Sequence, residues 1–185
     1  MPLWSSILER EPDYSWATGC IEPNAEISLS DRDWAEFKVG DLFNVTGTKT
    51  TKSGIKDKGK YPYLTTQATN NSVNGYTDFA TEKGNCIIAE SACVGYSSYQ
   101  EYDFTASDHV EKLVPYSSKF NRFIGLFINT MLRTSTEGKY NYGHKFNQGR
   151  IREQIIHLPV TLDGQPDYDF MEQYMKSLPF SKVLE

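Results

Sequence analysis

The densest group of chemically versatile side chains lies in residues 139–147, where the chain places Tyr140, Asn141, His144 and Lys145 almost side by side. A histidine and a lysine can exchange protons with a substrate, and amide and phenol groups can hydrogen-bond a ligand. The same residue types also read base edges and contact phosphates in DNA-binding proteins, and Asn-Tyr-Gly is favourable turn chemistry. These residues are therefore compatible with a catalytic pocket, a recognition surface or a structural turn.

The rest of the sequence lacks the residue sets that common enzymes need. The histidines His109, His144 and His157 are far apart, and no HxH or HxxxH pair is available to begin a zinc site. No GxGxxG, GxxxxGKS/T or GxSxG string occurs, which argues against a phosphate-binding loop and a serine hydrolase. The Asn/Asp-Pro-Pro-aromatic loop of a DNA methyltransferase is also missing. We therefore expect a protein that catalyses no reaction and needs no cofactor or metal.

One nuclease pattern can be matched loosely. Pro12 and Asp13, followed by Glu36, Phe37 and Lys38, fit the PD…ExK arrangement, in which two carboxylates hold a metal ion and the lysine assists the attacking water. The carboxylates of such a site lie on core strands, whereas Pro12 and Asp13 lie in an acidic segment without strand periodicity. A metal nuclease is therefore the weaker hypothesis.

Positive and negative charges are separated along the chain. The formal net charge is −5, which argues against a uniformly basic nucleic-acid-binding domain. Residues 44–62 are nevertheless rich in lysine, with Asp57 as their only acidic residue, and residues 119–152 are rich in Lys and Arg, with Glu137 as their only acidic residue. This separation favours a local basic surface that binds a polyanion. The alternative is a lysine loop that is merely solvated.

Four polar segments carry the side chains that DNA readout requires. Asn and Gln pair bidentately with adenine, Arg and Lys pair with guanine, and cations contact phosphates. We expect the lysines before Tyr61 to position DNA by its phosphates, and Gln67, Asn70, His144 and Lys145 to read bases. Because tyrosine-rich loops also bind proteins and sugars, a protein- or carbohydrate-binding module is the alternative. The candidate contact residues are Lys49, Lys52, Lys56, Lys58, Lys60, Gln67, Asn70, Tyr96, Tyr99, Gln100, Tyr140, Asn141, His144 and Lys145.

The elements that must position these residues are mostly strands in the first half of the chain. Residues 39–43 predict a short helix or turn, and the strand after it ends at Gly47. "YPYLTTQATNNSVNGYTDFA" predicts a strand, a polar turn and a returning strand, because Asn and Gly favour turns. An apolar strand at "CIIA", a Tyr-Ser-rich tip at Tyr96–Gln100 and a strand ended by Pro115 complete this half.

After Ser117 the apolar residues recur at spacings of three and four, which predicts a core-facing helix. A second helix is predicted in "NQGRIREQI", a strand in "IIHLPV", and a last helix after the N-cap Asp167. We therefore expect an α+β fold, in which the strand-rich first half forms a twisted sheet and helices from the second half pack on it. The stripe of the first helix comprises Phe120, Phe123, Ile124, Phe127, Ile128 and Met131.

Length and composition predict one globular unit. The 185 residues, of which 38% are hydrophobic, can bury one core. We expect a leader or packing arm at residues 1–33, a recognition domain at 34–180 and a tail at 181–185. The sequence has no apolar run of about 18 residues, no signal-peptide pattern and no CxxC pair. A cytoplasmic protein with reduced cysteines and no membrane contact is expected.

Taken in order, these segments resemble a known protein family. "FKVGDLFNVTGTKT", "YPYLTTQATNNSVNGYTD", "GNCIIAE" and "KYNYGHKFNQGRIREQIIHLPV", followed by "GQPDYDFMEQY", look like a target recognition domain. Such domains belong to the DNA specificity subunits of type I restriction-modification systems and their type IIB and IIG relatives. The resemblance covers about residues 34–180, and its most specific part is the run from Tyr140 to the last helix.

The resemblance implies a non-catalytic domain that reads one half of a bipartite double-stranded DNA target and docks on a methyltransferase subunit or a fused catalytic domain. A full specificity subunit of that family has two such domains, whereas one is seen here, which leaves three readings open: a whole subunit, a half subunit that gains a second domain by dimerisation, or a domain excised from a larger fusion enzyme. The loops at Gly47–Lys60, Gln67–Asn74 and Tyr96–Gln100, with the Tyr140 cluster, become candidates for the DNA face. The Tyr140 cluster is therefore interpreted as a recognition surface, or as a turn that supports one.

Overall fold

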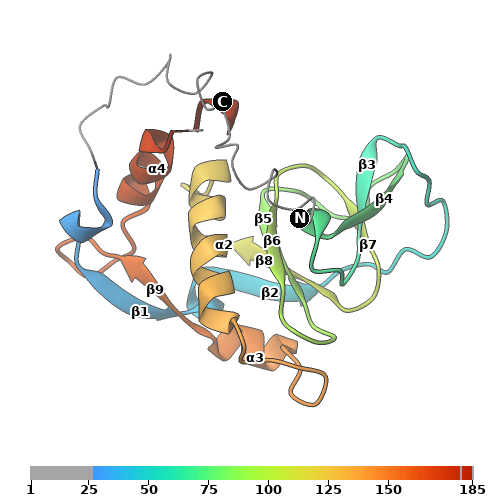
Figure 1. Ribbon diagram of the computed structural model, residues 1–185, viewed down its shortest axis with the longest axis horizontal. Coiled ribbons are helices and arrows are strands. Elements are labelled where there is room, and N and C mark those ends of the chain that lie inside the picture. The colour runs from blue at the N-terminus through green and yellow to red at the C-terminus, as the bar shows by residue number, and fades with distance from the viewer. Residues whose placement is uncertain (1–26, 180, 185) are drawn as a thin grey trace, which may run out of the picture.

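The computed structural model describes residues 27–179 and 181–184, in which two small sheets flank one long helix and a third sheet lies beyond the four-stranded one (Figure 1). Most of the expected leader lies outside these residues, together with Cys20 and with the Pro12-Asp13 pair of the nuclease pattern. The boundaries expected for the recognition domain and its tail remain predictions. The three sheets and the helix determine where each candidate loop emerges from the folded domain.

A two-stranded sheet joins an early and a late segment of the chain. Its strands, β1 (Trp34–Lys38) and β9 (Ile155–Pro159), pair antiparallel with Trp34 opposite Pro159. Within β9, Ile156 and Leu158 are fully buried and the intervening residue is exposed. Alternate side chains of a strand point to opposite faces, so one face of this sheet covers the core.

The four-stranded sheet has the order β2-β8-β5-β6 and is antiparallel throughout. Its strand β5 separates two hydrophobic clusters, because Ile87 and Ala89 face the larger cluster whereas Cys86 and Ile88 face the smaller one. Burial on both faces explains why its sequence is a continuous apolar run. The short helix α1 (Val39–Leu42) leads into β2. The strands are β2 (Phe43–Gly47), β5 (Cys86–Glu90), β6 (Ser97–Gln100) and β8 (Val110–Pro115).

The three-stranded sheet has the order β4-β3-β7 and carries the polar turn between β3 and β4. Strand β3 pairs antiparallel with β4 and parallel with β7. The sheet covers the smaller cluster, to which it contributes Leu64 and Ala106, and a buried contact of 3.2 Å joins the hydroxyls of Thr77 and Thr105. The strands are β3 (Tyr61–Leu64), β4 (Val73–Thr77) and β7 (Thr105–Ala106).

The long helix α2 (Arg122–Thr136) confirms the predicted aromatic stripe. Asn121 is its N-cap and accepts hydrogen bonds from two backbone N–H groups of the first turn, at 3.0 and 3.2 Å. A Cβ atom at Gly125 would lie 2.5 Å from the Tyr99 ring, so the absence of a side chain there lets β6 pack directly on the helix. The buried stripe residues are Phe120, Phe123, Ile124, Phe127 and Ile128, with Met131 partly buried.

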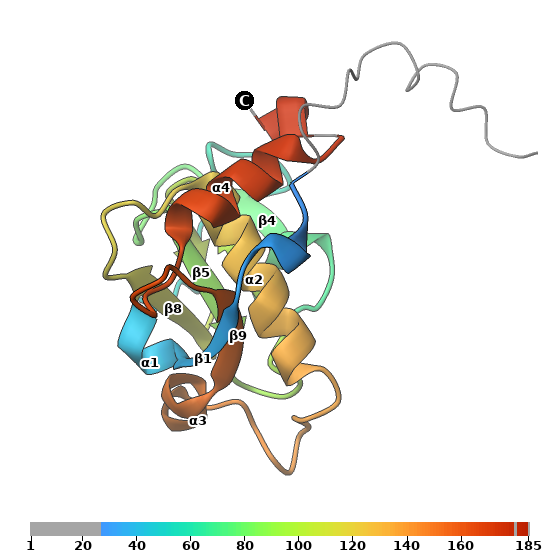
Figure 2. The ribbon, with the colours of Figure 1, turned by 90° about the vertical axis from the view of Figure 1, so that its left-hand side faces the viewer.

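The other predicted helices also form. Helix α3 (Gln148–Glu153) is capped by the side chain of Asn147, and α4 (Tyr168–Ser177) is capped by Asp167, as predicted. Figure 2 shows α4 beside α2, and a 3-10 turn, η3 (Ser181–Leu184), follows α4. Short polar side chains at N-caps satisfy backbone N–H groups that the first helical turn leaves free.

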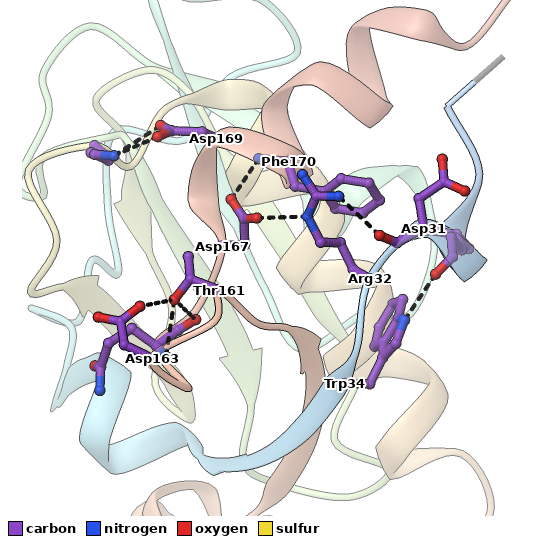
Figure 3. A network of polar contacts seen from close by, with 11 residues as sticks. Asp31, Arg32, Trp34, Thr161, Asp163, Asp167, Asp169 and Phe170 are labelled. Atoms are coloured by element: carbon purple, nitrogen blue, oxygen red, sulfur yellow. Dashed lines mark hydrogen bonds and ion pairs between the residues drawn. The ribbon is translucent and has the colours of Figure 1, made fainter.

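The described part of the expected leader is fixed to the start of α4 (Figure 3). A 3-10 turn, η1 (Leu29–Asp31), precedes Arg32, whose Nε donates to Asp167 Oδ2 at 2.9 Å. The guanidinium of Arg32 also lies 4.8 Å from the centre of the Phe170 ring. The indole N–H of Trp34 donates to the carbonyl oxygen of Leu29 at 3.0 Å. Residues 29–34 are therefore packed against the domain.

Two expectations about the first half need correction, although the α+β class is confirmed. The strands divide among three sheets and do not form one, and β9 from the second half completes the sheet that β1 begins. The expected tip at Tyr96–Gln100 is largely strand β6, in which Tyr99 and Gln100 are buried. Pairing with the preceding strand β5 accounts for part of this burial, and packing against the more distant helix α2 accounts for the rest.

Candidate nucleic-acid interface

The lysine loop, defined as residues 48–60, is held at several points along its backbone. The N–H of Thr48 donates to Val110 O at 3.3 Å, and that of Thr51 donates to Ala106 O at 2.7 Å. Farther along, Lys56 and Tyr76 exchange two backbone hydrogen bonds of 2.9 Å, so this part of the loop lies along the outer side of β4. The backbone is therefore anchored, while the lysine side chains are exposed.

The lysines of this loop differ in what they contact. Lys56 forms an exposed ion pair with Asp78, and the Lys60 ammonium lies 5.1 Å from the centre of the Tyr61 ring. The remaining three make no ion pair with any residue that the structure describes, and they are Lys49, Lys52 and Lys58. A polyanion would find these three charges available without breaking an internal pair.

A buried carboxylate holds the start of the lysine loop. Glu82 is 7% exposed, and its Oε1 accepts a hydrogen bond of 2.7 Å from the backbone N–H of Lys49. Its other oxygen pairs with the ammonium of Lys112, which is itself mostly buried. Because this pair lies beside the smaller cluster, the anchoring of the loop depends on the packing of the three-stranded sheet.

The turn between β3 and β4, which we call the amide turn and define as residues 65–72, has an unusual backbone. Asn70, Asn71 and Ser72 all have positive φ angles, of 49°, 51° and 66°. Residues with a Cβ atom rarely adopt this left-handed region, although asparagine tolerates it better than most. Three such residues in succession require contacts from outside the turn.

The amide side chains of this turn are partly engaged within it. Gln67 is half-buried, and its Nε2 donates to the carbonyl oxygens of Thr69 and Val73, at 3.3 and 2.6 Å. Asn70 is exposed and uses its Nδ2 for one bond, to Val73 O at 2.9 Å. Both N–H groups of Gln67 are thus committed, which argues against bidentate base reading by Gln67, whereas Asn70 keeps one N–H and its oxygen.

Tyr99 and Gln100, which the sequence placed on a reading tip, instead support other parts of the fold. Tyr99 is 7% exposed, its hydroxyl donates to Asn85 Oδ1 at 3.0 Å, and burial raises its pKa to about 12. Gln100 is 4% exposed, and its Nε2 donates to the backbone carbonyl of Asn71 at 3.1 Å. Neither side chain is available to a groove of DNA in this structure.

One surface groove brings the lysine loop and the amide turn together. It is lined by Lys60 at the end of the loop, by Asn71 of the turn and by Tyr102, which is 69% exposed. Arg122 at the start of α2 lines the same groove and pairs with Glu101. Cationic, amide and aromatic groups from distant parts of the sequence therefore share one surface.

The Tyr140 cluster forms a tight hairpin over residues 139–147. Asn141 and His144 exchange backbone hydrogen bonds of 3.2 and 3.0 Å. The side-chain oxygen of Asn141 accepts the N–H groups of Gly143 and His144, at 2.9 and 3.0 Å. Asn141 therefore stabilises the turn, which is the structural role that its Asn-Tyr-Gly context allowed.

Tyr140 supports the same hairpin from within. Its hydroxyl donates to Gln154 Oε1 at 2.9 Å, and its ring stacks on His144 with centroids 5.6 Å apart and packs on Phe146 at 4.5 Å. Burial raises the pKa of Tyr140, so this phenol stays neutral. Tyr140 is therefore a supporting residue, and the stacked imidazole of His144 is the more accessible partner.

Tyr142 is the most prominent residue of the hairpin and was not among the predicted contacts. Its side chain is 78% exposed, and the Lys145 ammonium lies 4.9 Å from the centre of its ring. Tyr140 and Tyr142 are two residues apart, a spacing that puts both on one face of a regular strand, so the sequence held no local signal that separated them. Tyr142 lies within the tight turn that the Asn141–His144 backbone bonds close. An exposed aromatic ring beside a cation suits contact with nucleotides.

Tyr96 lines a second groove, together with Arg133 of α2 and Gly138 before the hairpin. The guanidinium of Arg133 lies 4.6 Å from the centre of the Tyr96 ring. A Cβ atom at Gly95 would lie 2.9 Å from Phe146, so the segment before β6 packs closely on the hairpin. Tyr96 is half-buried at this second groove, whereas Tyr99 and Gln100 line the first groove with side chains that are only 7% and 4% exposed.

Glu111 of β8 connects the candidate segments. Its carboxylate accepts hydrogen bonds of 2.8 Å from the Ser91 hydroxyl and from Gln148 Nε2, at the start of the helix after the hairpin. Gly47, where the lysine loop begins, lies opposite Glu111 in the β2–β8 register. One carboxylate therefore joins the segment before β6 to the start of α3, on a residue whose backbone lies opposite the end of β2.

The lysine loop and an acidic region lie at opposite ends of the molecule. In Figure 1 the lysine loop extends to the far right, while η1, β1 and α4 lie on the left. The left-hand elements carry exposed or partly exposed carboxylates, and these include Asp31, Asp33, Asp163, Asp167 and Asp169. The lysine loop is thus far from the acidic end, whereas the second basic segment, residues 119–152, adjoins it, because Lys119 pairs with Asp169.

The two charged residues of the nuclease pattern that the structure describes, Glu36 and Lys38, contact side chains of β9 and α3. Glu36 lies 3.4 Å from His157, and Lys38 pairs with Glu153 at 2.7 Å, which raises the pKa of Lys38. Within residues 27–179 and 181–184, no three His, Cys, Asp or Glu side chains gather as metal ligands would. Over the same residues, no helix has the length and apolar character to cross a membrane.

Comparison with known proteins identifies a match over most of the chain. The family described as "Type I restriction modification DNA specificity domain" matches residues 31–182. A protein of Heyndrickxia coagulans, "Type II restriction enzyme BgcI specificity subunit S.BcgI", is 36% identical over 152 residues, which cover 80% of this chain and 44% of that protein.

Solved structures show the same fold at low sequence identity. The S subunit of a type I restriction-modification system from M. genitalium has a TM-score of 0.59 and 15% identity, over 84% of this chain and 40% of that one. A second structure, described under "complex assembly and conformational transition of the type I R-M system", has a TM-score of 0.50 and 11% identity, over 89% and 42%. This chain spans less than half the length of each of these proteins.

Proposed function

This chain belongs to the family of type I restriction modification DNA specificity domains, and we propose that it reads one half of a two-part double-stranded DNA target for a restriction-modification enzyme. It acts as a recognition component and leaves the chemistry to its partners. The alternative, a protein- or carbohydrate-binding module, has no support among the matched proteins.

One observation carries this proposal. An anchored loop presents three lysines that form no ion pair with the residues that the structure describes. The same loop ends at a groove that it shares with the amide turn through Lys60 and Asn71. Lysine ammonium groups suit phosphates because they are point charges on flexible stems. Amide groups suit base edges because they offer a donor and an acceptor together. The two kinds of contact are adjacent, as a domain that reads a duplex requires.

The candidate contacts then divide by role. Lys49, Lys52 and Lys58 contact phosphates, and Asn70 reads a base from the amide turn. On the hairpin, exposed Tyr142 with the neighbouring Lys145 approaches the duplex, and the stacked His144 stands beside them. Gln67, Tyr99, Gln100, Tyr140 and Asn141 support these residues and do not touch DNA.

The partners follow from the part of the relatives that this chain covers. Because the chain spans 44% of a specificity subunit, a second recognition domain, in the same protein or in a second copy, would read the other half-site. The methyltransferase subunit or fused catalytic domain would bind away from the lysine loop. The acidic end around α4 is the side that a DNA backbone avoids, which supports that arrangement.

Selection from a pool of random duplexes, using the full 185-residue chain, tests the proposal. We expect enrichment of one short sequence and an affinity that falls with salt, with a slope of roughly −0.9 per phosphate contact. Equal recovery of all sequences, or binding to a neutral glycan or peptide without salt dependence, would overturn it. Cleavage of DNA by this chain alone in magnesium would favour the nuclease hypothesis instead.

A further inference from the structure

We propose that Gln100, Ser98 and Asn71 are positioning residues, which hold Asn70 in the conformation that reads a base although Gln100 and Ser98 never touch DNA. This inference rests on the proposed function and extends it. It assigns a role in sequence choice to strand β6, whose residues the sequence had placed on an exposed tip. In this proposal the strand holds the amide turn in place and does not itself contact DNA.

The amide turn cannot keep its shape through local contacts alone. Its left-handed residues include Ser72, with a φ of 66°, and a serine has less tolerance for this region than asparagine. The local bonds between backbone groups are the Ser72 N–H to Thr69 O and the Thr65 N–H to Ser72 O, both 2.9 Å, and the Gln67 and Asn70 side chains add the bonds described above. A turn of this kind persists when the surrounding structure over-determines it.

Strand β6 supplies the missing contacts. Gln100 Nε2 donates to Asn71 O at 3.1 Å, and the Ser98 hydroxyl lies 3.4 Å from the same oxygen. In the opposite direction, Asn71 Nδ2 donates to Tyr99 O at 3.1 Å. Gln100 Nε2 also donates to Ser98 Oγ at 2.9 Å, and Ser98 and Ser72 hydroxyls lie 3.4 Å apart. Hydrogen bonds donated by the strand and by the turn therefore join the amide turn to β6.

Water cannot easily replace these bonds. Ser72 is fully buried, Ser98 is 1% exposed and Gln100 is 4% exposed. A buried donor that loses its partner remains unsatisfied, so each bond favours one geometry strongly. The strand itself is held by its pairing with β5 and by the close packing of Tyr99 on Gly125. The reading turn is therefore attached to the rigid part of the molecule.

The consequence is a pre-oriented amide on Asn70. Its Nδ2 must point at Val73 O, since an oxygen in that place would repel the carbonyl. The second N–H and Oδ1 then remain open, and Oδ1 has no hydrogen bond to any described residue. This pattern matches the edge of adenine in the major groove, whose N6 amine donates and whose N7 accepts. The base class that the turn selects is therefore adenine.

The test compares the full chain with three variants in the same duplex selection. Gln100→Met keeps the size of the side chain and removes its hydrogen bonds, and Ser98→Ala removes a hydroxyl. Ser97→Ala is the matched control, because Ser97 is a buried neighbour on β6 whose hydroxyl has no hydrogen-bond partner in the described structure. The readouts are the selected sequence, the affinity for duplexes with one adenine replaced, and the salt slope.

For the wild-type chain we expect about tenfold or greater preference for adenine at one position. In Gln100→Met and Ser98→Ala this preference falls below about threefold, while affinity for random duplex and the salt slope stay unchanged. Ser97→Ala behaves as wild type. If both test variants keep the wild-type preference, the inference is wrong and the proposed function stands. If the wild-type chain enriches no sequence, the proposed function itself fails.

A glycine rescue separates positioning from general stability. Asn71→Ala disfavours the positive φ angle, whereas Asn71→Gly permits it, and both lose the side-chain bond to Tyr99 O. We expect Asn71→Gly to retain more adenine preference than Asn71→Ala, at similar affinity for random duplex. Equal preference in the two variants contradicts the inference. This pair also decides the question if Gln100→Met fails to fold.

Discussion

The two hydrophobic clusters of this protein differ in size and in the way they are stabilised. The larger cluster gathers around α2, and the aromatic rings of Trp34 and Tyr174 pack on Phe127 with centroids 6.1 and 6.0 Å away. The smaller cluster lies beneath the three-stranded sheet and consists of Leu64, Cys86, Ile88, Phe104, Ala106 and Val110, with Val73 packed against it.

The smaller cluster is supplemented by buried polar contacts. The Glu82–Lys112 pair, the Thr77–Thr105 contact and the bonds from β6 to the amide turn surround it. Apolar burial is non-directional, whereas hydrogen bonds between buried groups specify one geometry. The lysine loop and the amide turn both leave from this region. The comparison indicates that the larger cluster provides stability and the smaller one provides the geometry for recognition.

The largest expected effect is loss of stability from the larger cluster. Phe127→Ala removes a ring that is 3% exposed and should lower the free energy of unfolding by about 3 to 5 kcal/mol, through lost burial and a cavity. Denaturant unfolding measures the change. Tyr116→Ala, at a residue 64% exposed, is the control and should cost less than about 0.5 kcal/mol. Similar losses in both variants would contradict the role given to the larger cluster.

Glu82→Ala tests the smaller cluster. It leaves Lys112 without its partner and the Lys49 N–H without an acceptor, so stability should fall by up to about 3 kcal/mol. Hydrogen exchange should rise mainly in residues 48–60 and the sheet beside them. Asp78→Ala breaks an exposed pair and should cost about 0 to 1 kcal/mol. Uniform exchange across the whole protein would argue against a locally anchored loop.

Replacing Lys52 and Lys58 together by Ala tests the charges without disturbing the fold. Affinity should fall about 10- to 100-fold near 0.1 M salt for all sequences alike, and the salt slope should drop by roughly 1.8. Lys56→Ala should have a smaller effect, because Asp78 already neutralises that charge. A changed sequence preference in the double variant, with the slope intact, would show that these lysines read bases.

The hairpin offers a matched pair of tyrosines. Tyr142→Ala should weaken DNA binding by about fivefold or more without lowering the melting temperature, since the ring is 78% exposed. Tyr140→Ala should instead destabilise the hairpin, because it loses the bond to Gln154 and the packing on Phe146. Fluorescence anisotropy and thermal unfolding separate the two effects. Unchanged binding by Tyr142→Ala would remove this residue from the interface.

The smallest expected effect is alkaline destabilisation through Cys86. Burial raises the pKa of its thiol from 9.0 to about 12, so the folded protein must keep the thiol neutral. The stabilisation that comes from the neutral buried thiol is complete below about pH 9 and is lost as the pH rises toward 12, with about 1 kcal/mol gone at pH 10. Unfolding at pH 8 and pH 10 should show a smaller difference in Cys86→Ala. An equal difference in both proteins would contradict the burial of this thiol.

Much of the local structure was predictable from the sequence. The spacing of apolar residues predicted the buried stripe of α2, and the residue type of Asp167 predicted the N-cap of α4. The continuous apolar run predicted strand β5, which is buried on both faces. Each depends on interactions within a few residues of the chain or on the average environment of a residue type. The resemblance in motif order also predicted the family correctly. These are the properties that the sequence determined by itself.

Only the tertiary structure decided which polar side chains are available to a partner. Gln100 and Asn70 were both candidate DNA contacts in the sequence, yet Gln100 is buried and bonded to a residue 29 positions away while Asn70 is exposed. Likewise, Lys56 is neutralised by Asp78 and Lys58 is not, which no local pattern indicates. Burial and hydrogen-bond commitment depend on contacts between distant segments. The residue type limits what a side chain can do, and its long-range partners determine whether that chemistry remains free.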